Sequence, residues 1–255
     1  MDQPYQPDRS LKGKVRRRAV RLMHRRPLAV APDRPMVTFS FDDAPRSAAE
    51  TGARLLEARG ARGVFYVSAG LAGDEGHMGP FAEAADYRRL AEAGHEIACH
   101  TYSHLDCGRA DGRTASLDAA RNVETLSSWR AGPIRNFAYP YGDVAPAPKA
   151  ALGGRYATLR ALHHGVITAG TDLNQTPAVG IEGPDGQAVA ERWLAEALAR
   201  KAWLILYTHD VRPEPSPYGC TPEVLARLID RAQADGFDIV TAAEASRRLQ
   251  IAPAA

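Results

Sequence analysis

Two adjacent acids, Asp42 and Asp43, come directly after the strand-like run at residues 36–41. Successive side chains of a strand point to opposite faces, so one carboxylate of the pair is expected to point back toward a core. A buried carboxylate is very costly unless it is paired with a cation or coordinates a metal. The pair therefore predicts a site in which the two acids have different partners.

Two histidines could bind a metal ion together with one of these acids. His100 and His104 lie four residues apart in the stretch HTYSH, and within one helical turn this spacing places both on one face. The chain has eight histidines, so the spacing alone is as well explained by chance. Joined to a carboxylate from another strand end, two histidines hold a catalytic metal and leave coordination open for water.

These candidates follow predicted strands, which alternate with amphipathic helical segments. That alternation is typical of a parallel sheet covered by helices, where polar chemistry collects at the carboxyl ends of the strands. The pair Asp42 and Asp43, the two histidines of HTYSH, the stretch YPYG and His209 each follow such a run. The predicted strands are residues 36–41, 63–67, 96–99, 136–139, 166–169, 203–208 and 237–241.

Helix signals separate the strands. The stretch SAAE at residues 47–50 predicts a capping box and a helix that runs to Gly60. Thr221 is the predicted N-cap of another helix, with Pro222 in its first turn and Gly236 after its end. Residues 84–93 and 115–129 are also predicted helices. Seven strands in 255 residues favour one α/β domain with a closed, barrel-like sheet.

The basic charge of the chain is confined to its N-terminal segment. Residues 1–34 hold ten Lys or Arg and three acids, whereas the remainder holds 22 basic and 27 acidic residues. We therefore divide the chain into a basic tail, residues 1–34, and a domain, residues 35–255. Nothing in the domain suggests nucleic-acid recognition, and no nucleic-acid partner is expected.

The tail also has apolar residues at helical spacing, among them Leu11, Val15 and Leu22. One interpretation is a solvated arm. Another is a basic amphipathic helix that contacts the inner membrane peripherally through residues 9–26. Contact with nucleic acid is a third interpretation of the charge alone.

Cysteine usage and hydropathy bear on the compartment. The three cysteines make no disulfide framework, which fits a reducing compartment. The basic tail is not followed by the apolar core of a signal peptide, and no stretch approaches a membrane span. We expect a cytoplasmic protein, with the inner membrane surface as the site of any peripheral contact.

Four motifs in order resemble a known enzyme family. SFDDAP, HTYSH, FAYPYG and LYTHDV are similar to the successive motifs of the polysaccharide deacetylases, also called NodB-homology or carbohydrate esterase family 4 enzymes. The resemblance spans roughly residues 36–246. It implies a distorted (β/α)7–8 barrel, a divalent metal that is usually zinc, and hydrolysis of N-acetyl groups from amino-sugar polymers. Among its branches the chain most resembles bacterial exopolysaccharide deacetylases, including those that act on holdfast-type adhesins.

The resemblance also implies roles for individual residues. Asp42 corresponds to the catalytic base, and the metal ligands correspond to Asp43, His100 and His104. The backbone N–H of Tyr141 corresponds to the donor that stabilises the oxyanion. The implied substrate is a polysaccharide or a lipid-linked oligosaccharide precursor, and the oligomeric state is not indicated.

The residues that would support the acid and the base differ from the family pattern. His209 corresponds to the general acid, and Asp172 is our candidate for the carboxylate that tunes it, with an ordinary turn Asp as the alternative. Many members of the family carry an arginine beside the catalytic base where this chain has Ala138. Arg135 is three strand residues away and on the opposite face, so the group that orients Asp42 is not identified.

Three tyrosines are candidates for substrate binding: Tyr139, Tyr141 and Tyr218. Two functions other than polysaccharide deacetylation stay open. One is a metal-dependent hydrolase of a small non-sugar amide on the same fold. The other is a non-catalytic carbohydrate-binding protein, which the missing arginine would suit.

Overall fold

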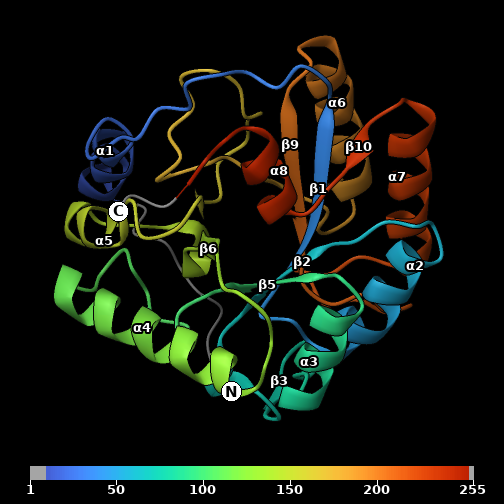
Figure 1. The fold of residues 1–255 in the computed structure, drawn as a ribbon, viewed down its shortest axis with the longest axis horizontal. Coiled ribbons are helices and arrows are strands. Elements are labelled where there is room, and N and C mark those ends of the chain that lie inside the picture. Colours follow the sequence, from blue (N-terminus) through green and yellow to red (C-terminus); the bar gives the residue numbers. More distant parts are fainter. Residues whose placement is uncertain (1–9, 253–255) are drawn as a thin grey trace.

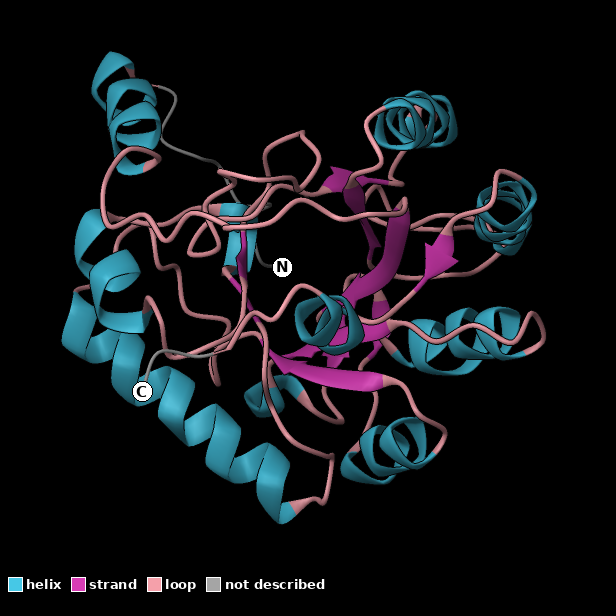
Figure 2. Cartoon of the chain, turned by 45° about the horizontal axis from the view of Figure 1, so that its top comes forward, coloured by secondary structure: helices cyan, strands magenta, loops and turns pink. Residues whose placement is uncertain are grey.

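The computed structural model describes residues 10–252, and its helices lie outside a central sheet (Figures 1 and 2). Eight parallel strands form this sheet, and β3 (Glu75–Gly76) and β4 (Gly79–Pro80) form a separate antiparallel hairpin. The strands of the main sheet are β1 (Met36–Asp42), β2 (Val64–Val67), β5 (Glu96–Cys99), β6 (Phe137–Ala138), β7 (Leu159–Arg160), β8 (Val179–Gly180), β9 (Trp203–Thr208) and β10 (Asp238–Ile239).

Most of the helices connect one strand of the chain to the next, whereas the first precedes β1 and the last follows β10. They are α1 (Leu11–Val20), α2 (Ala53–Glu57), α3 (Ala84–Glu92), α4 (Gly112–Ser128), α5 (Pro146–Leu152), α6 (Gly186–Ala199), α7 (Pro222–Ala234) and α8 (Ala242–Arg248). Short helices of other types cover Ala48–Gly52 (a π-helix), Ala69–Leu71 and Pro140–Gly142. None of the helices within residues 10–252 has the length and apolar character that a bilayer crossing requires.

The sheet is a distorted barrel, as the sequence predicts. Its strand order is β7-β6-β5-β2-β1-β9-β8, with β10 paired to β1. Residues 173–180 join the two edges, because Leu173 and Thr176 exchange backbone hydrogen bonds with β7 and Val179–Gly180 pairs with β9. We call residues 173–180 the seam. The barrel is thus completed by the irregular residues 173–178, which lead directly into the short strand β8.

The central strands agree best with the predictions. Every residue of β1 and β9 is buried, which is typical of parallel strands covered on both faces. The predicted strand at residues 166–169 is wrong, since Ile167 makes only an isolated antiparallel bridge to Trp203. Strands β7 and β8 were not predicted, because two-residue strands carry no periodic hydrophobic signal.

The helices confirm most predicted starts but not the one at Ser47. Thr221 caps α7 by accepting a hydrogen bond from the Val224 N–H, with Pro222 in the first turn. Ser47 is already helical, with φ −61° and ψ −34°, and makes no capping hydrogen bond. Its hydroxyl instead accepts a hydrogen bond from the Val211 N–H at 3.2 Å, so this serine links the start of the π-helix at Ala48–Gly52 to the loop after β9.

The described part of the N-terminal segment packs against the domain. Helix α1 lies beside α5 (Figure 1), where the Lys149 ammonium donates to the Val20 carbonyl at 2.9 Å. The same ammonium donates to Asp172 Oδ2 at 2.6 Å, and Lys149 is fully buried. Arg26 donates to the carbonyls of residues 156 and 157. Residues 20–28 are therefore held by the fold and are not a solvated arm.

We predict that Lys149→Met lowers the free energy of unfolding by about 3 kcal/mol, because removing one partner of a buried pair leaves the Asp172 charge uncompensated. Urea denaturation followed by circular dichroism measures the change. The exposed Lys201→Met is the matched control and should shift stability by less than about 0.5 kcal/mol. Equal effects of the two substitutions would contradict this role for Lys149.

Candidate active site

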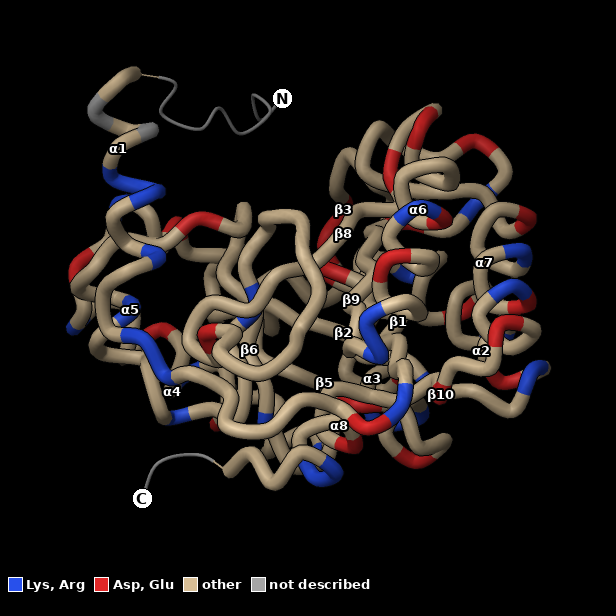
Figure 3. The backbone as a smooth tube through the Cα atoms, turned by 90° about the horizontal axis from the view of Figure 1, so that it is seen from above, with Lys and Arg blue, Asp and Glu red and all other residues tan. Residues whose placement is uncertain are grey.

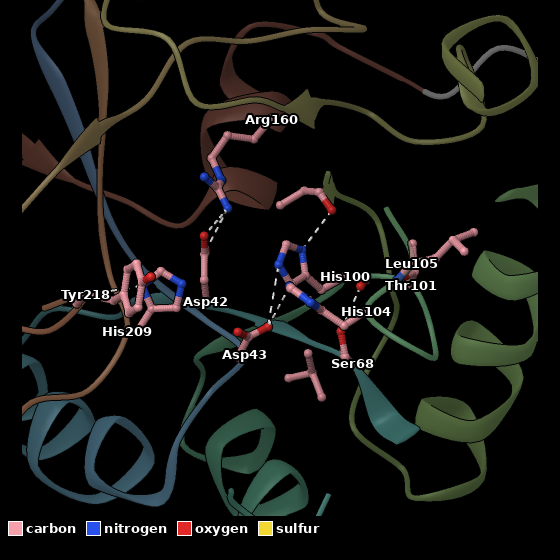
Figure 4. A network of polar contacts seen from close by, with 12 residues as sticks. Asp42, Asp43, Ser68, His100, Thr101, His104, Leu105, Arg160, His209 and Tyr218 are labelled. Atoms are coloured by element: carbon pink, nitrogen blue, oxygen red, sulfur yellow. Dashed lines mark hydrogen bonds and ion pairs between the residues drawn. The ribbon is translucent and has the colours of Figure 1, made fainter. Parts of the chain in front are cut away.

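The two adjacent acids have different partners, as the strand geometry predicts (Figure 4). Asp42 is the last residue of β1, and Asp43 follows it with φ 58°. This left-handed conformation is uncommon for a residue other than glycine. Asp42 pairs with Arg160, whereas Asp43 lies against His100 and His104.

Asp43, His100 and His104 fit a divalent metal ion. Asp43 Oδ1 lies 3.6 Å from His100 Nε2 and 3.3 Å from His104 Nε2, and one ligand atom from each residue falls within 4.8 Å of the others. Oδ1 is buried and accepts no hydrogen bond from the described part of the chain, a costly state that a bound cation would relieve. Two histidines and one carboxylate leave coordination positions open.

A backbone hydrogen bond and burial make His100 suitable as a metal ligand. Its Nδ1 donates to the Ala138 carbonyl at 2.8 Å, which fixes the tautomer and directs Nε2 toward Asp43. Burial lowers the pKa of His100 to about 3, so the ring is neutral and its Nε2 lone pair is available to a metal.

The histidine pair lies on a loop, so the predicted helical turn is wrong. Thr101 and His104 have φ 62° and 53°, and residues 100–104 contain no helix. The loop is closed by Thr101 Oγ1, which accepts a hydrogen bond from the Leu105 N–H at 2.8 Å. Asp118 of α4 accepts two further backbone hydrogen bonds from the loop. Local hydrogen bonds thus bring both rings to one side without a helix.

Arg160 holds the candidate base. Its Nη2 donates to both carboxylate oxygens of Asp42 at 2.6 Å, and the guanidinium lies 4.8 Å above the Tyr66 ring. Arg160 is fully buried on β7 and is in register with Ala138 of β6. The arginine that the family resemblance leads one to expect at residue 138 is therefore supplied by the neighbouring strand, next to a side chain as small as alanine.

His209 is placed to donate a proton. Its Nδ1 lies 2.9 Å from Glu182 Oε1 and 3.2 Å from the Tyr218 carbonyl. Burial alone would lower the pKa of His209, but the Glu182 hydrogen bond and the charges of Asp42 and Asp43 raise it to about 9. The imidazole is thus protonated at neutral pH. A cation beside Asp43 would offset the rise in the pKa of His209 that the Asp43 charge causes, but not the rise that Glu182 causes.

The prediction that Asp172 tunes His209 is corrected by these contacts. Asp172 Oδ2 accepts from Lys149, and Oδ1 accepts from the backbone N–H groups of Arg26 and Asn174. Its role is structural, at the contact between the N-terminal segment and the domain. Glu182, two residues after β8, was missed because that strand was not recognised.

The three candidate tyrosines have different environments. Tyr139 is only 1% exposed and its hydroxyl donates to a backbone carbonyl, so its prediction as a substrate-binding residue is wrong. Tyr141 is 38% exposed and its ring packs edge-on against His104, with centroids 4.4 Å apart. The half-buried Tyr218 ring lies 5.7 Å from that of His209. Tyr141 and Tyr218 therefore flank the site on opposite sides.

Unusual backbone conformations gather at the site. Of nine non-glycine residues with positive φ in the described chain, five belong to it: Asp43, Ala44, Thr101, His104 and Tyr141. Gly142 follows with φ 64°, and a Cβ there would lie 2.2 Å from a side-chain carbon of Leu162. Such conformations cost free energy and persist where surrounding contacts enforce them, as is common at functional sites.

The sequence matches a family model that supports this assignment. Residues 29–153 match the model described as polysaccharide deacetylase, which covers the candidate base and the three candidate metal ligands. No curated protein shows a significant match to the chain.

Solved structures share the fold. The Xyl-CE4 domain of a multidomain xylanase from the hindgut metagenome of Trinervitermes trinervoides aligns with a TM-score of 0.62 at 16% identity, over 88% of this chain and 95% of that one. A family 4 acetyl xylan esterase from Clostridium thermocellum, in complex with cobalt, gives 0.59 at 21% identity, over 86% and 93%. A CE4 family pseudoenzyme from Bacillus anthracis gives 0.56 at 14% identity, over 84% and 66%.

At these identities the structures show a common architecture and leave the chemistry of this chain to its own residues. The family model and the motif residues at the ends of β1 and β5 agree with that architecture. Through residues 29–153, the chain belongs to the polysaccharide deacetylase family.

Proposed function

We propose that the protein is a metal-dependent deacetylase that hydrolyses N-acetyl groups on N-acetylhexosamine residues of a bacterial exopolysaccharide or its lipid-linked precursor. One observation carries the proposal: Asp42 and His209 both lie beside the set of Asp43, His100 and His104 at the carboxyl end of the sheet (Figure 4). A base and an acid beside one metal site are what hydrolysis of an amide requires.

Each carboxylate of the pair has one task in this proposal. Asp43, His100 and His104 would hold the divalent metal, for which zinc is our first expectation. When bound, such a metal polarises the acetamide carbonyl and lowers the pKa of a coordinated water toward neutrality. Asp42 accepts the proton of the attacking water, and Arg160 fixes the direction of its two oxygens.

The other side of the site completes the reaction. His209, protonated because of Glu182, donates its proton to the leaving amine nitrogen. We assign the oxyanion contact to the backbone N–H of Tyr141, and the left-handed conformation of Tyr141 and its ring contact with His104 support this assignment. The half-buried Tyr218 ring beside His209 is our candidate for contact with the sugar.

The substrate and location are also proposals. The exopolysaccharide substrate, including a holdfast-type adhesin, follows from the motif resemblance. The acetyl xylan esterase of the same fold binds cobalt, which supports a divalent metal here and makes acetylated xylan a necessary comparison substrate. The alternatives are hydrolysis of a small amide and carbohydrate binding without turnover, since one structure of this fold is a pseudoenzyme. We propose a cytoplasmic location.

Metal removal tests the proposed function. Acetate release from N-acetylglucosamine oligomers should stop after dialysis against a chelator and return with zinc or cobalt. Asp43→Ala should lower bound metal, measured by mass spectrometry, together with activity. Glu92→Ala, an exposed acid on α3, is the control and should change neither. Acetate release only from acetylated xylan or small amides would favour an alternative substrate, and binding without release would favour the non-catalytic alternative.

Arg160 is predicted to act as a positioning residue for Asp42. Arg160→Ala should lower kcat by about 10²-fold with little change in KM or bound metal, because a misplaced base loses its geometry. Asp42→Asn sets the reference, with a loss of about 10² to 10⁴.

The register between β6 and β7 offers a rescue experiment. Adding Ala138→Arg to Arg160→Ala returns a guanidinium from the adjacent strand, and kcat should recover in part. Steady-state kinetics with metal analysis measures both effects. Circular dichroism confirms that each variant compared is folded; full activity of a folded Arg160→Ala, or no recovery in a folded double variant, would contradict the positioning role.

The acid side predicts a pH dependence. The nearby carboxylates raise the pKa of His209 to about 9, and a cation beside Asp43 offsets part of this rise, so kcat/KM should fall with an alkaline limb at or below that value as the imidazolium loses its proton. Glu182→Gln removes the carboxylate that stabilises the imidazolium, so the alkaline limb should move to lower pH. The pH–rate profiles of the two proteins give the shift. An unchanged alkaline limb in Glu182→Gln would exclude His209 as the acid.

A further inference from the structure

Exposed apolar side chains gather in the N-terminal segment. Eight large hydrophobic residues in the described chain are exposed, and five of them lie within residues 11–30. Leu11 and Leu22 are 78% and 77% exposed, and Val15, Met23 and Val30 are also exposed. Isolated apolar residues on a surface are ordinary, but a concentration in one short segment marks an interaction site.

Helix α1 turns its apolar side away from the domain. The helix docks through Gly13, Arg16 and Val20, which share one face, and Arg16 donates to the Gly108 carbonyl and pairs with Asp143. With 3.6 residues per turn, Leu11 and Val15 lie on the opposite face. A helix that merely packed on its own domain would bury this apolar face, so the arrangement points to an external partner.

Cations surround the exposed apolar residues. Arg18, Arg21 and Arg25 are exposed, and Leu22 and Met23 lie between the last two in sequence. Figure 3 shows the basic residues of this segment along α1 and the turn that follows it. The partner therefore has an apolar layer and a negatively charged layer close together.

A cavity beside this segment adds positive charge. It has a volume of about 270 Å³ and is lined by Arg21, Arg25 and His164, among others. The acid that lines it is Asp172, whose charge is already paired with the buried Lys149. Two arginine residues thus line a cavity with room for an anion of the size of a phosphate headgroup, and Arg25 is held there by the hydrogen bond that its Nη2 donates to the Gly170 carbonyl at 2.8 Å.

We propose that this surface, formed by Leu11, Val15, Leu22, Met23, Arg18, Arg21 and Arg25, binds the anionic face of a phospholipid bilayer. The apolar side chains enter the boundary between headgroups and acyl chains, and the arginines contact lipid phosphates. Nucleic acid would use the arginines but not the exposed leucines. A second copy of the chain would use the leucines, but it would bring the same positive charges together.

Binding to vesicles tests this proposal without requiring turnover. The full-length protein should float with vesicles of phosphatidylcholine mixed with phosphatidylglycerol, and weakly with phosphatidylcholine alone. Raising the salt concentration should weaken binding, because exposed charges are screened. Each of Arg18→Gln and Arg21→Gln should lower the partition coefficient about fivefold, and each of Leu11→Ser and Leu22→Ser about tenfold.

Matched controls lie on other helices. Leu117→Ser on α4, where Leu117 is 61% exposed, and Arg227→Gln on α7 should change binding less than about twofold. Equal binding to neutral and anionic vesicles, or equal effects of test and control variants, would overturn the proposal. If light scattering shows that the leucine variants convert a dimer to a monomer while vesicle binding is unchanged, the partner is a second copy.

Discussion

The ion pair between Asp42 and Arg160 is the contact on which the candidate site depends. Both side chains are almost completely withdrawn from water, and a lone charge at either position would be strongly destabilising. The pair fixes a carboxylate at the end of the central strand and lets the next residue, Asp43, turn away in a left-handed conformation. Because one acid is neutralised by an arginine and the other is available to a cation, two adjacent carboxylates can be buried together.

Much of this site could be predicted from the sequence. Strand β1 is buried throughout, and the motifs follow β1, β5 and β9. They therefore lie at one edge of a parallel sheet, and their residues are Asp42, Asp43, His100, His104 and His209. Asp42, Asp43 and His209 follow the long apolar strands β1 and β9, which carry a clear signal, and the two histidines follow the shorter β5. The predicted helical turn at the two histidines is nevertheless wrong. Hydrogen bonds within a loop bring the two rings together instead.

The residues that could not be predicted share one physical reason. Arg160 and Glu182 stand on or just after two-residue strands, where no periodicity distinguishes a strand from a loop. The alternation of buried and exposed positions cannot show that Arg160 points inward, because β7 is too short to alternate. The predicted roles of Tyr139 and Asp172 are wrong for a different reason. Their sequence neighbourhoods resemble a binding loop, but tertiary contacts bury one in the core and pair the other with Lys149.

The seam of the barrel lies close to the groups that hold the base and the acid, and it contributes none of the candidate metal ligands. Residues 173–180 pair on one side with β7, the strand that carries Arg160, and lead on the other to Glu182, so the groups that hold the base and the acid both lie next to the seam. The three candidate metal ligands come from the position directly after β1 and from the loop after β5, and the seam forms neither. The base Asp42 is adjacent to the candidate metal ligand Asp43, but the groups that hold the base and the acid, Arg160 and Glu182, lie in a separate part of the chain. Substitutions along the seam can adjust the two proton-transfer groups while the metal-binding half is left intact.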